Sequence, residues 1–118
     1  MRDHTRLKVF ALADEVVLQI YQATRQFPEQ EKYGLVSQMR RAAVSVPSNM
    51  VEGCSRESRI EYIRFLEIAF GSLKELHYQF DLSKRLGYLI DDNSDDCEAK
   101  IIETEKVLSA LLRSKRKT

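Results

Sequence analysis

Apolar residues recur along the chain at alternating spacings of three and four, the period at which side chains gather on one face of an α-helix. The pattern occurs in four segments separated by short polar stretches, and it predicts helices over residues 7–25, 29–53, 58–86 and 94–113. Four amphipathic helices joined by short connections pack most simply as an up-down-up-down bundle around one core. The residues expected to face that core are Phe10, Ala13, Val17, Ile20, Thr24, Val36, Met39, Ala43, Val46, Met50, Gly53, Tyr62, Leu66, Ala69, Leu73, Leu76, Phe80, Ser83, Cys97, Ile101, Thr104, Leu108 and Leu111.

Pro47 stands in the middle of the second segment, where its missing N–H and its clash with the preceding turn should disturb a helix. Either two helices meet at this position or one helix bends. The apolar spacing keeps its phase across Pro47, whereas a loop between two helices would reset it. The pattern therefore favours one helix over residues 29–53 that is kinked at Pro47.

Three other positions predict how the third helix begins, packs and ends. Ser58 and Glu61 have the spacing of a capping box, in which the serine covers an exposed N–H of the first turn. Gly87 is expected to stop the helix in a left-handed conformation. Gly71, in the interior, costs about 1 kcal/mol relative to alanine, so we expect a close approach of another helix there.

The composition supports one all-α domain. The chain has 118 residues, of which 43% are hydrophobic and 31% charged, with only 4 glycines and 2 prolines. The net charge of +1 produces no overall field for polyanions, so a nucleic-acid surface depends on local segregation of charge. Two runs flank the last helix, and both also suit its dipole. The acidic run is Asp91, Asp92, Asp95, Asp96 and Glu98, and the basic run is Arg113, Lys115, Arg116 and Lys117.

The sequence offers little material for catalysis. Cys54 and Cys97 have neither CxxC spacing nor neighbouring ligands, so we expect reduced, buried thiols and no metal site. His4 is expected in a flexible tail, and His77 has no nucleophile recognisably arranged around it. No apolar stretch is long enough to span a bilayer. These observations predict a cytoplasmic protein that is not an enzyme and that holds no cofactor.

The richest polar group lies on the second predicted helix and could contact RNA or a protein partner. Arginine binds phosphate through its planar fork, and an asparagine side chain can donate hydrogen bonds. The alternative is a solvated face or a polar network between subunits, with a glutamate and an arginine paired four residues apart. The candidate binding residues are Arg40, Arg41, Asn49, Glu52 and Arg56.

The second and third helices carry more apolar residues than one bundle face needs. Because each helix of a four-helix bundle has a solvated side, the surplus favours self-association. The alternative is that long aromatic side chains simply wrap around a thick core. The candidate interface residues are Val44, Val51, Phe65, Ile68 and Phe70.

Three stretches carry a resemblance to a known family: FPEQEKYGLVSQMRRAAVSVPSNMVEG, SRIEYIRFLEIAFGSLKELHYQF and LGYL. Together they cover most of the chain from Phe27 to Leu89. The chain resembles the small four-helix-bundle proteins encoded by intervening sequences within bacterial 23S ribosomal RNA genes. The resemblance implies a bent second helix containing Pro47, a ring-like homo-oligomer of five subunits, and no enzymatic activity.

The chain is also similar to the accessory proteins of diversity-generating retroelements, which bind nucleic acid and a reverse transcriptase. Those proteins are strongly basic, and this chain, at +1, departs from that pattern. Our first hypothesis is a homo-oligomeric scaffold or adaptor with weak RNA binding. The second is a dedicated nucleic-acid-binding accessory protein of a retroelement-like or ribosomal RNA system.

Overall fold

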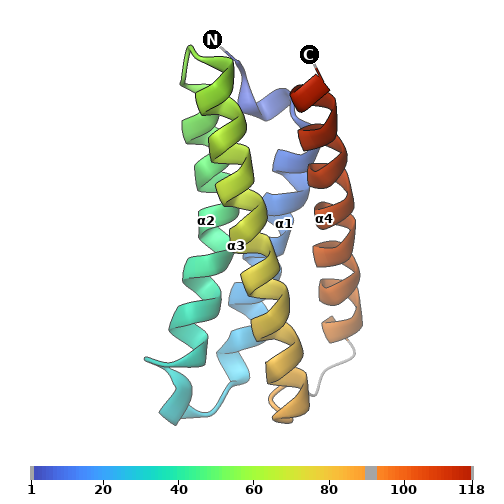
Figure 1. The fold of residues 1–118 in the computed structure, drawn as a ribbon. Helices are drawn as coiled ribbons and strands as arrows, with labels where there is room; N and C mark the ends of the chain where they lie inside the picture. Colours follow the sequence, from blue (N-terminus) through green and yellow to red (C-terminus); the bar gives the residue numbers. More distant parts are fainter. Residues whose placement is uncertain (1, 90–92, 118) are drawn as a thin grey trace.

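The computed structural model describes residues 2–89 and 93–117, and within these residues every regular element is a helix. The four long helices are α1 (Lys8–Ala23), α2 (Leu35–Cys54), α3 (Arg59–Arg85) and α4 (Asn93–Lys117). Successive helices run in opposite directions, so both termini lie at the end where α2 turns into α3 (Figure 1). The predicted all-α four-helix bundle is confirmed, and it measures 45 × 24 × 20 Å.

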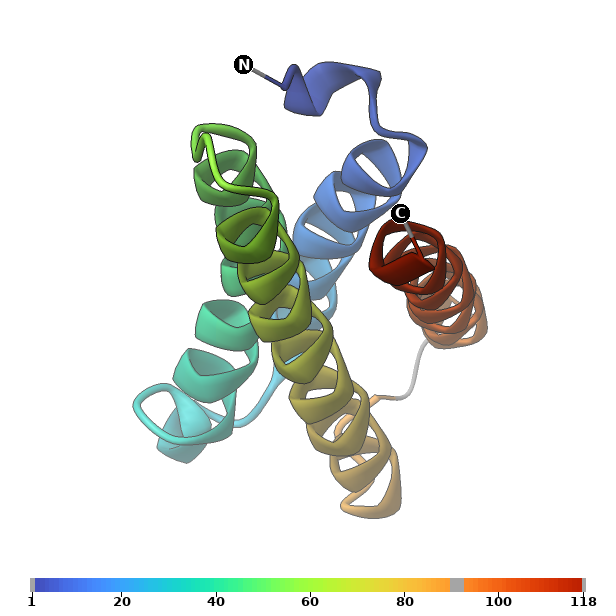
Figure 2. The same cartoon turned by 45° about the horizontal axis from the view of Figure 1, so that its top comes forward.

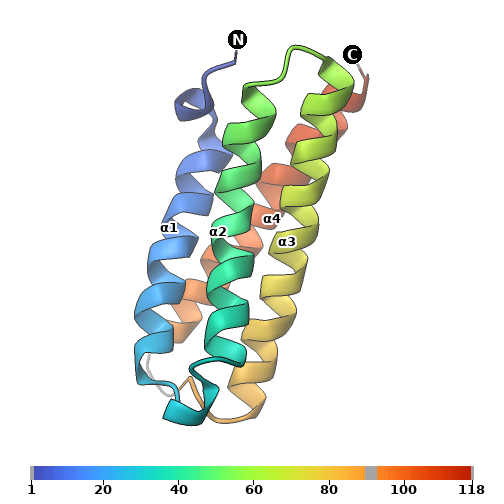
Figure 3. The same ribbon diagram turned by 90° about the vertical axis from the view of Figure 1, so that its left-hand side faces the viewer.

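Each helix packs against its neighbours in the chain, and α4 closes the bundle against α1. Figure 3 shows α2 between α1 and α3 with α4 behind them, and Figure 2 shows the same order from nearer the top. The predicted faces of α2 and α3 form the core. In α1 the buried residues are Val9, Leu12, Ala13, Val16 and Ile20, whereas the predicted Phe10 and Val17 lie half-buried at the edge. In α4 the buried leucine of the last turns is Leu112, and Leu111 flanks it.

The N-terminal residues pack on the bundle, and the expectation of a flexible tail at His4 is wrong. A short 3-10 helix, η1 (His4–Arg6), precedes α1, and Asp3 accepts a hydrogen bond from the Thr5 backbone N–H at 3.0 Å. The His4 ring lies edge-on to Phe10, with 4.8 Å between the ring centres. Arg2 reaches across to the turn between α2 and α3, where it donates to the Arg56 carbonyl oxygen at 2.8 Å.

α2 begins at Leu35, later than the predicted residue 29. After Pro28 the chain forms a 3-10 turn, η3 (Glu29–Glu31), and Gly34 then has non-helical backbone angles. The Glu31 carboxylate accepts the Leu35 backbone N–H at 3.1 Å, so it caps the helix from outside. The apolar period cannot distinguish this arrangement from a longer helix, because residues 29–34 contribute little to the apolar face.

Pro47 lies inside α2, which runs through it without interruption. Its ring is buried with the core-facing residues of the helix. One helix, and not two, therefore crosses this position. Burial of the ring between packed helices offsets the lost backbone hydrogen bond.

The two ends of α3 have the geometry that the sequence predicts. The Ser58 hydroxyl accepts the Glu61 backbone N–H at 3.3 Å. At the other end Gly87 has a φ of 79°, and its N–H donates to the Lys84 carbonyl while that of Tyr88 donates to Ser83. This pair of hydrogen bonds is a Schellman motif, which requires the left-handed residue that glycine supplies.

α4 extends to Lys117, beyond the predicted end at residue 113. Its last turn is held against α3, because Arg116 pairs with Glu67 at 2.7 Å and Arg59 donates to the Lys115 carbonyl oxygen. Of the predicted acidic run, Asp95 and Asp96 lie in the first turn of α4. Asp91 and Asp92 lie outside the described residues.

The close contact between two helices is at Gly53 and not at Gly71, where the sequence predicts it. Gly53 is the position where α2 and α3 touch, since a Cβ there would lie 2.8 Å from the Phe65 Cβ and 3.4 Å from the Tyr62 carbonyl oxygen. Gly71, where we expected a close helix contact, is exposed, and a Cβ built there would meet no atom of another described helix within 4 Å. The prediction for Gly71 is therefore wrong within the bundle.

We expect opposite effects from alanine at these two positions. Gly53→Ala should lower the free energy of unfolding by about 1–3 kcal/mol, because the added methyl group must push α2 and α3 apart. Gly71→Ala should raise it by about 0.5–1 kcal/mol, because alanine is the better helix former and meets no neighbour. Urea unfolding followed by circular dichroism measures both, and equal effects at the two sites would contradict the packing described here.

Candidate functional site

Arg40, a predicted RNA contact, extends from α2 toward the end of α1. Its Nε donates to the Thr24 hydroxyl at 2.9 Å, and its Nη2 donates to the Tyr21 carbonyl oxygen at 3.1 Å. The guanidinium also lies 4.5 Å from the centre of the Tyr21 ring. Because the last carbonyls of a helix lack partners within it, Arg40 caps the C-terminus of α1.

Asn49, Glu52 and Arg56 also make contacts within the chain. Asn49 Nδ2 donates to the Ser45 carbonyl oxygen at 2.7 Å, and Arg56 pairs with Glu52 at 3.2 Å. The Arg56 guanidinium lies 5.0 Å from the centre of the Phe65 ring. These three residues lie on the α3 side of α2 and toward its C-terminus, away from Arg40. The five candidates therefore do not form one continuous surface.

Arg41 is the exposed arginine among the five candidates. It is exposed on the outer side of α2, one residue and therefore about a quarter of a turn away from Arg40. It lies between two hollows, one toward α1 and one toward α3.

The larger hollow is a groove of about 610 Å³ between the end of α1 and the start of α2. Cations, tyrosines and hydroxyls surround a partly apolar floor, and no carboxylate is among the described lining residues. Tyr21, Lys32 and Tyr33 are not among the predicted binding residues, because only the fold brings the end of α1 next to the turn before α2. The i, i+4 spacing of Tyr33, Ser37 and Arg41 was the available signal. The lining residues are Tyr21, Lys32, Tyr33, Val36, Ser37, Arg40, Arg41, Val44 and Ser45.

The smaller hollow, of about 350 Å³, lies on the seam between α2 and α3. The Ser45 and Ser72 hydroxyls share a hydrogen bond of 2.8 Å across this seam. Arg41 and Glu75 both line it, so its charges are mixed. Compared with the groove, it presents no net positive surface to an anion.

The five candidate interface residues lie on different flanks of the bundle. Val44 and Val51 are 38% and 39% exposed on the α1 side of α2, and Val44 lines the groove. On α3, Ile68 is 45% exposed, whereas Phe65 is half-buried beside Gly53 and Arg56. Phe70 packs against the core.

Phe70 lies on the opposite flank of α3 from Ile68 and faces α4. Lys74 and His77, four and seven residues further along the helix, both contact Glu105 of α4 at 3.4 and 2.8 Å. The Glu105 side chain is largely buried, so this cluster joins α3 to α4. It also gives His77 a structural task. Within residues 2–89 and 93–117, no three histidine, cysteine, aspartate or glutamate side chains are placed to share a metal ion.

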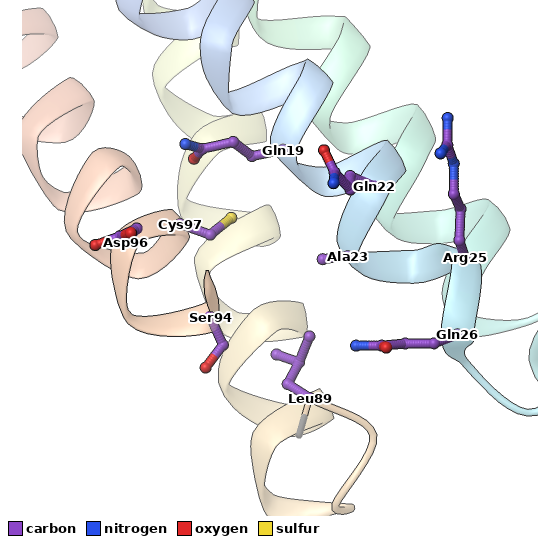
Figure 4. A pocket seen from close by; sticks show the side chains of 9 residues that line it. All are labelled: Gln19, Gln22, Ala23, Arg25, Gln26, Leu89, Ser94, Asp96 and Cys97. Carbon is purple, nitrogen blue, oxygen red and sulfur yellow. The ribbon is translucent and has the colours of Figure 1, made fainter. Parts of the chain in front are cut away.

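A polar cavity of about 450 Å³ lies between α1 and α4, at the end away from the termini (Figure 4). Gln19 reaches from α1 toward Asp96 and Cys97. Burial raises the pKa of the Cys97 thiol to about 12. A thiol of that pKa is almost entirely protonated near neutral pH, so it is a poor nucleophile. Cys97 therefore gives the cavity no activated nucleophile.

Both cysteines are buried and reduced, as the sequence predicts. Burial also raises the pKa of the Cys54 thiol. In the described part of the chain, no helix is both long enough and apolar enough to cross a membrane.

Comparison with known proteins identifies relatives of this bundle. The model of the 23S rRNA-intervening sequence protein family matches residues 5–110. A crystal structure of a protein of unknown function from the S23 ribosomal protein family of Bacteroides thetaiotaomicron is similar, with a TM-score of 0.79. It shares 23% sequence identity, and the match covers 89% of this chain and 95% of that one, which shows a common fold. No curated protein matches the chain.

Arg40→Ala is expected to act on stability. It should lower the free energy of unfolding by about 1–2 kcal/mol, because Thr24 and the Tyr21 carbonyl lose their donor and the Tyr21 ring loses the guanidinium. Arg41→Ala, its neighbour on the exposed side, should change stability by no more than about 0.5 kcal/mol. Urea unfolding of both variants measures the difference. Equal stability of the two variants would show that Arg40 does not cap α1.

The Cys97 thiol should resist labelling in the folded protein. At pH 8 we expect it to react with a disulfide reagent at least about 100-fold more slowly than in urea, because burial and the raised pKa leave little thiolate. The folded state holds the thiol proton more tightly than the unfolded chain, so stability is lost as pH rises from 9 toward 12. Cys97→Ala should lose less stability over that range than the parent protein, and an identical loss would contradict the shift.

Proposed function

The chain belongs to the 23S rRNA-intervening sequence protein family, and on that premise we propose that it is a non-enzymatic, self-associating scaffold or adaptor that binds RNA weakly. We place it in the cytoplasm, as a ring of five copies of the chain. The ring and its number follow from the family resemblance. The surface of α3 supports self-association independently.

The observation that carries this proposal is an exposed apolar stripe on α3, formed by Ile60, Ile68 and Tyr78. These side chains are 75%, 45% and 61% exposed, and their spacing places them along the outer side of the helix. The stripe lies away from the core face through Tyr62, Leu66 and Leu73. Exposed apolar side chains spread over several turns of a solvated face are costly to leave in water, and a second copy of the chain can cover them.

The stripe retains only Ile68 from the five predicted interface residues. Phe65 and Phe70 are half-buried within the bundle. Val44 and Val51 lie on the side of α2 that faces α1. In a ring each subunit uses two different surfaces, one toward each neighbour. The α3 stripe is one of these surfaces in our proposal.

Our second candidate function is that of a nucleic-acid-binding accessory protein. The specific observation in its favour is the groove beside Arg41, which cations line without a carboxylate among the described residues. At a net charge of +1, such local segregation is what a polyanion would have to recognise.

Ile68→Glu should break the self-association. A charge buried against an apolar partner surface costs several kcal/mol, so we expect the mass in solution to fall toward the 13.7 kDa of one chain. Ile68→Val keeps the position apolar and should keep the mass of the parent protein. Light scattering after size exclusion gives the mass, and circular dichroism checks that the helices are intact. An unchanged mass for Ile68→Glu, or a single-chain mass for the parent protein, would overturn the proposal.

A further inference from the structure

The groove between α1 and α2 combines two kinds of group that recognise the same ligand. Its rim carries the cations Lys32, Arg40 and Arg41, and two tyrosines, Tyr21 and Tyr33, line it as well. Val36 and Val44 supply an apolar floor. Cations attract phosphate, whereas tyrosine rings and an apolar floor accept a flat aromatic group.

Lys32 and Arg41 take part in none of the ion pairs within the described residues, whereas several other arginines and lysines do. Both of these side chains are exposed and available to an external anion. The internally paired cations include Arg56, Lys74, Arg85, Lys100 and Arg116.

Tyr33 is 88% exposed, and it stands in the turn that precedes α2. Because the ring is almost fully exposed, it adds little to the stability of the bundle. The Lys32 ammonium lies 5.6 Å from the centre of its ring, so a positive charge and a free aromatic surface occur side by side. Tyr21 is less available, because the Arg40 guanidinium already covers it at 4.5 Å.

We propose that this groove binds a single-stranded nucleic acid, with a base stacked on Tyr33 and the adjoining phosphates held by Lys32 and Arg41. The inference deepens the RNA-binding part of the proposed function and rests on it. Stacking needs a base that is not already paired and stacked, which excludes a regular duplex. The absence of carboxylates from the described lining favours a polyanion, and the exposed ring favours one that carries bases over an acidic peptide.

The assignment also separates Arg41 from the other candidate contacts. Arg40 forms the wall of the groove and holds Tyr21 in place, so it acts by positioning. Asn49, Glu52 and Arg56 are engaged elsewhere on α2 and do not line the groove. The ligand therefore contacts one arginine of the predicted set, together with two residues of the preceding turn.

The test is fluorescence anisotropy of labelled single-stranded oligouridylate and oligothymidylate of about 12 nucleotides, over a salt series from about 50 to 200 mM. Tyr33→Ala should weaken binding about tenfold, whereas Tyr33→Phe should keep it, because the ring carries the contact. Arg41→Ala should weaken binding and reduce the slope of log affinity against log salt by about 0.7, the value for one lost contact to a single strand.

A matched control lies outside both the groove and the α3 stripe. Arg113→Ala removes an exposed arginine from α4 whose hydrogen bond goes to Ser109 on the same helix. It should not change the affinity. A loss in Arg113→Ala that matches the loss in Arg41→Ala would overturn the groove as the site.

Other outcomes also decide the proposal. A duplex of the same length that binds as tightly as the single strand, or a polyglutamate peptide that displaces the strand at equal charge, would overturn base stacking. Binding by the parent protein with no effect of either groove variant would reject the groove and leave RNA binding intact. If the parent protein shows no binding even at the lowest salt, both the groove and RNA binding are rejected. Self-association is judged separately from the mass of Ile68→Glu, so the two proposals fail independently.

Discussion

Gly53 lets α2 approach α3 closely near the turn that joins them, because a side chain there would collide with the Phe65 Cβ. The same pair of helices is linked midway by the Ser45 and Ser72 hydroxyls, and near the far end by the Ser83 hydroxyl, which contacts the Met39 sulfur at 3.3 Å. With three points of contact along its length, α2 can neither slide nor rotate on α3. That orientation determines which of its polar residues point into the bundle, toward α1 or to solvent.

The different roles of Arg40 and Arg41 follow from this orientation. Neighbouring residues on a helix point in directions about 100° apart, so once Arg40 faces the end of α1, Arg41 must face outward. Arg40 closes the C-terminus of α1 and covers Tyr21, which forms one wall of the groove. The Glu31 carboxylate forms another link, because it caps α2 and accepts the Tyr88 hydroxyl at 2.9 Å. The turn that carries Lys32 and Tyr33 is thus tied to α2 and to the end of α3.

The two proposed surfaces use different parts of the molecule. The α3 stripe consists of apolar side chains that the fold leaves exposed, and the groove consists of cations and rings brought together by the end of α1 and the turn before α2. A protein with a net charge of +1 has no general attraction for nucleic acid, so a small, carboxylate-poor groove is a way to create a local one. Repetition of the groove on each copy of an oligomer would strengthen binding to a long strand through effective concentration.

The sequence by itself determined the number and type of the helices, because an apolar period of 3.6 residues, a serine cap at Ser58 and a glycine stop at Gly87 are local signals that tertiary contacts reinforce. It also indicated that α2 continues through Pro47, since the phase of the apolar face did not change. Only the tertiary structure decided the true start of α2, because the cap comes from a glutamate side chain folded back onto it. It likewise decided which surfaces are available, because exposure depends on how each helix is rotated against its neighbours. Hence Gly53, not Gly71, is the close contact, Phe70 faces α4, and Tyr33 and Arg41 share a groove that residue spacing along a single helix could only suggest.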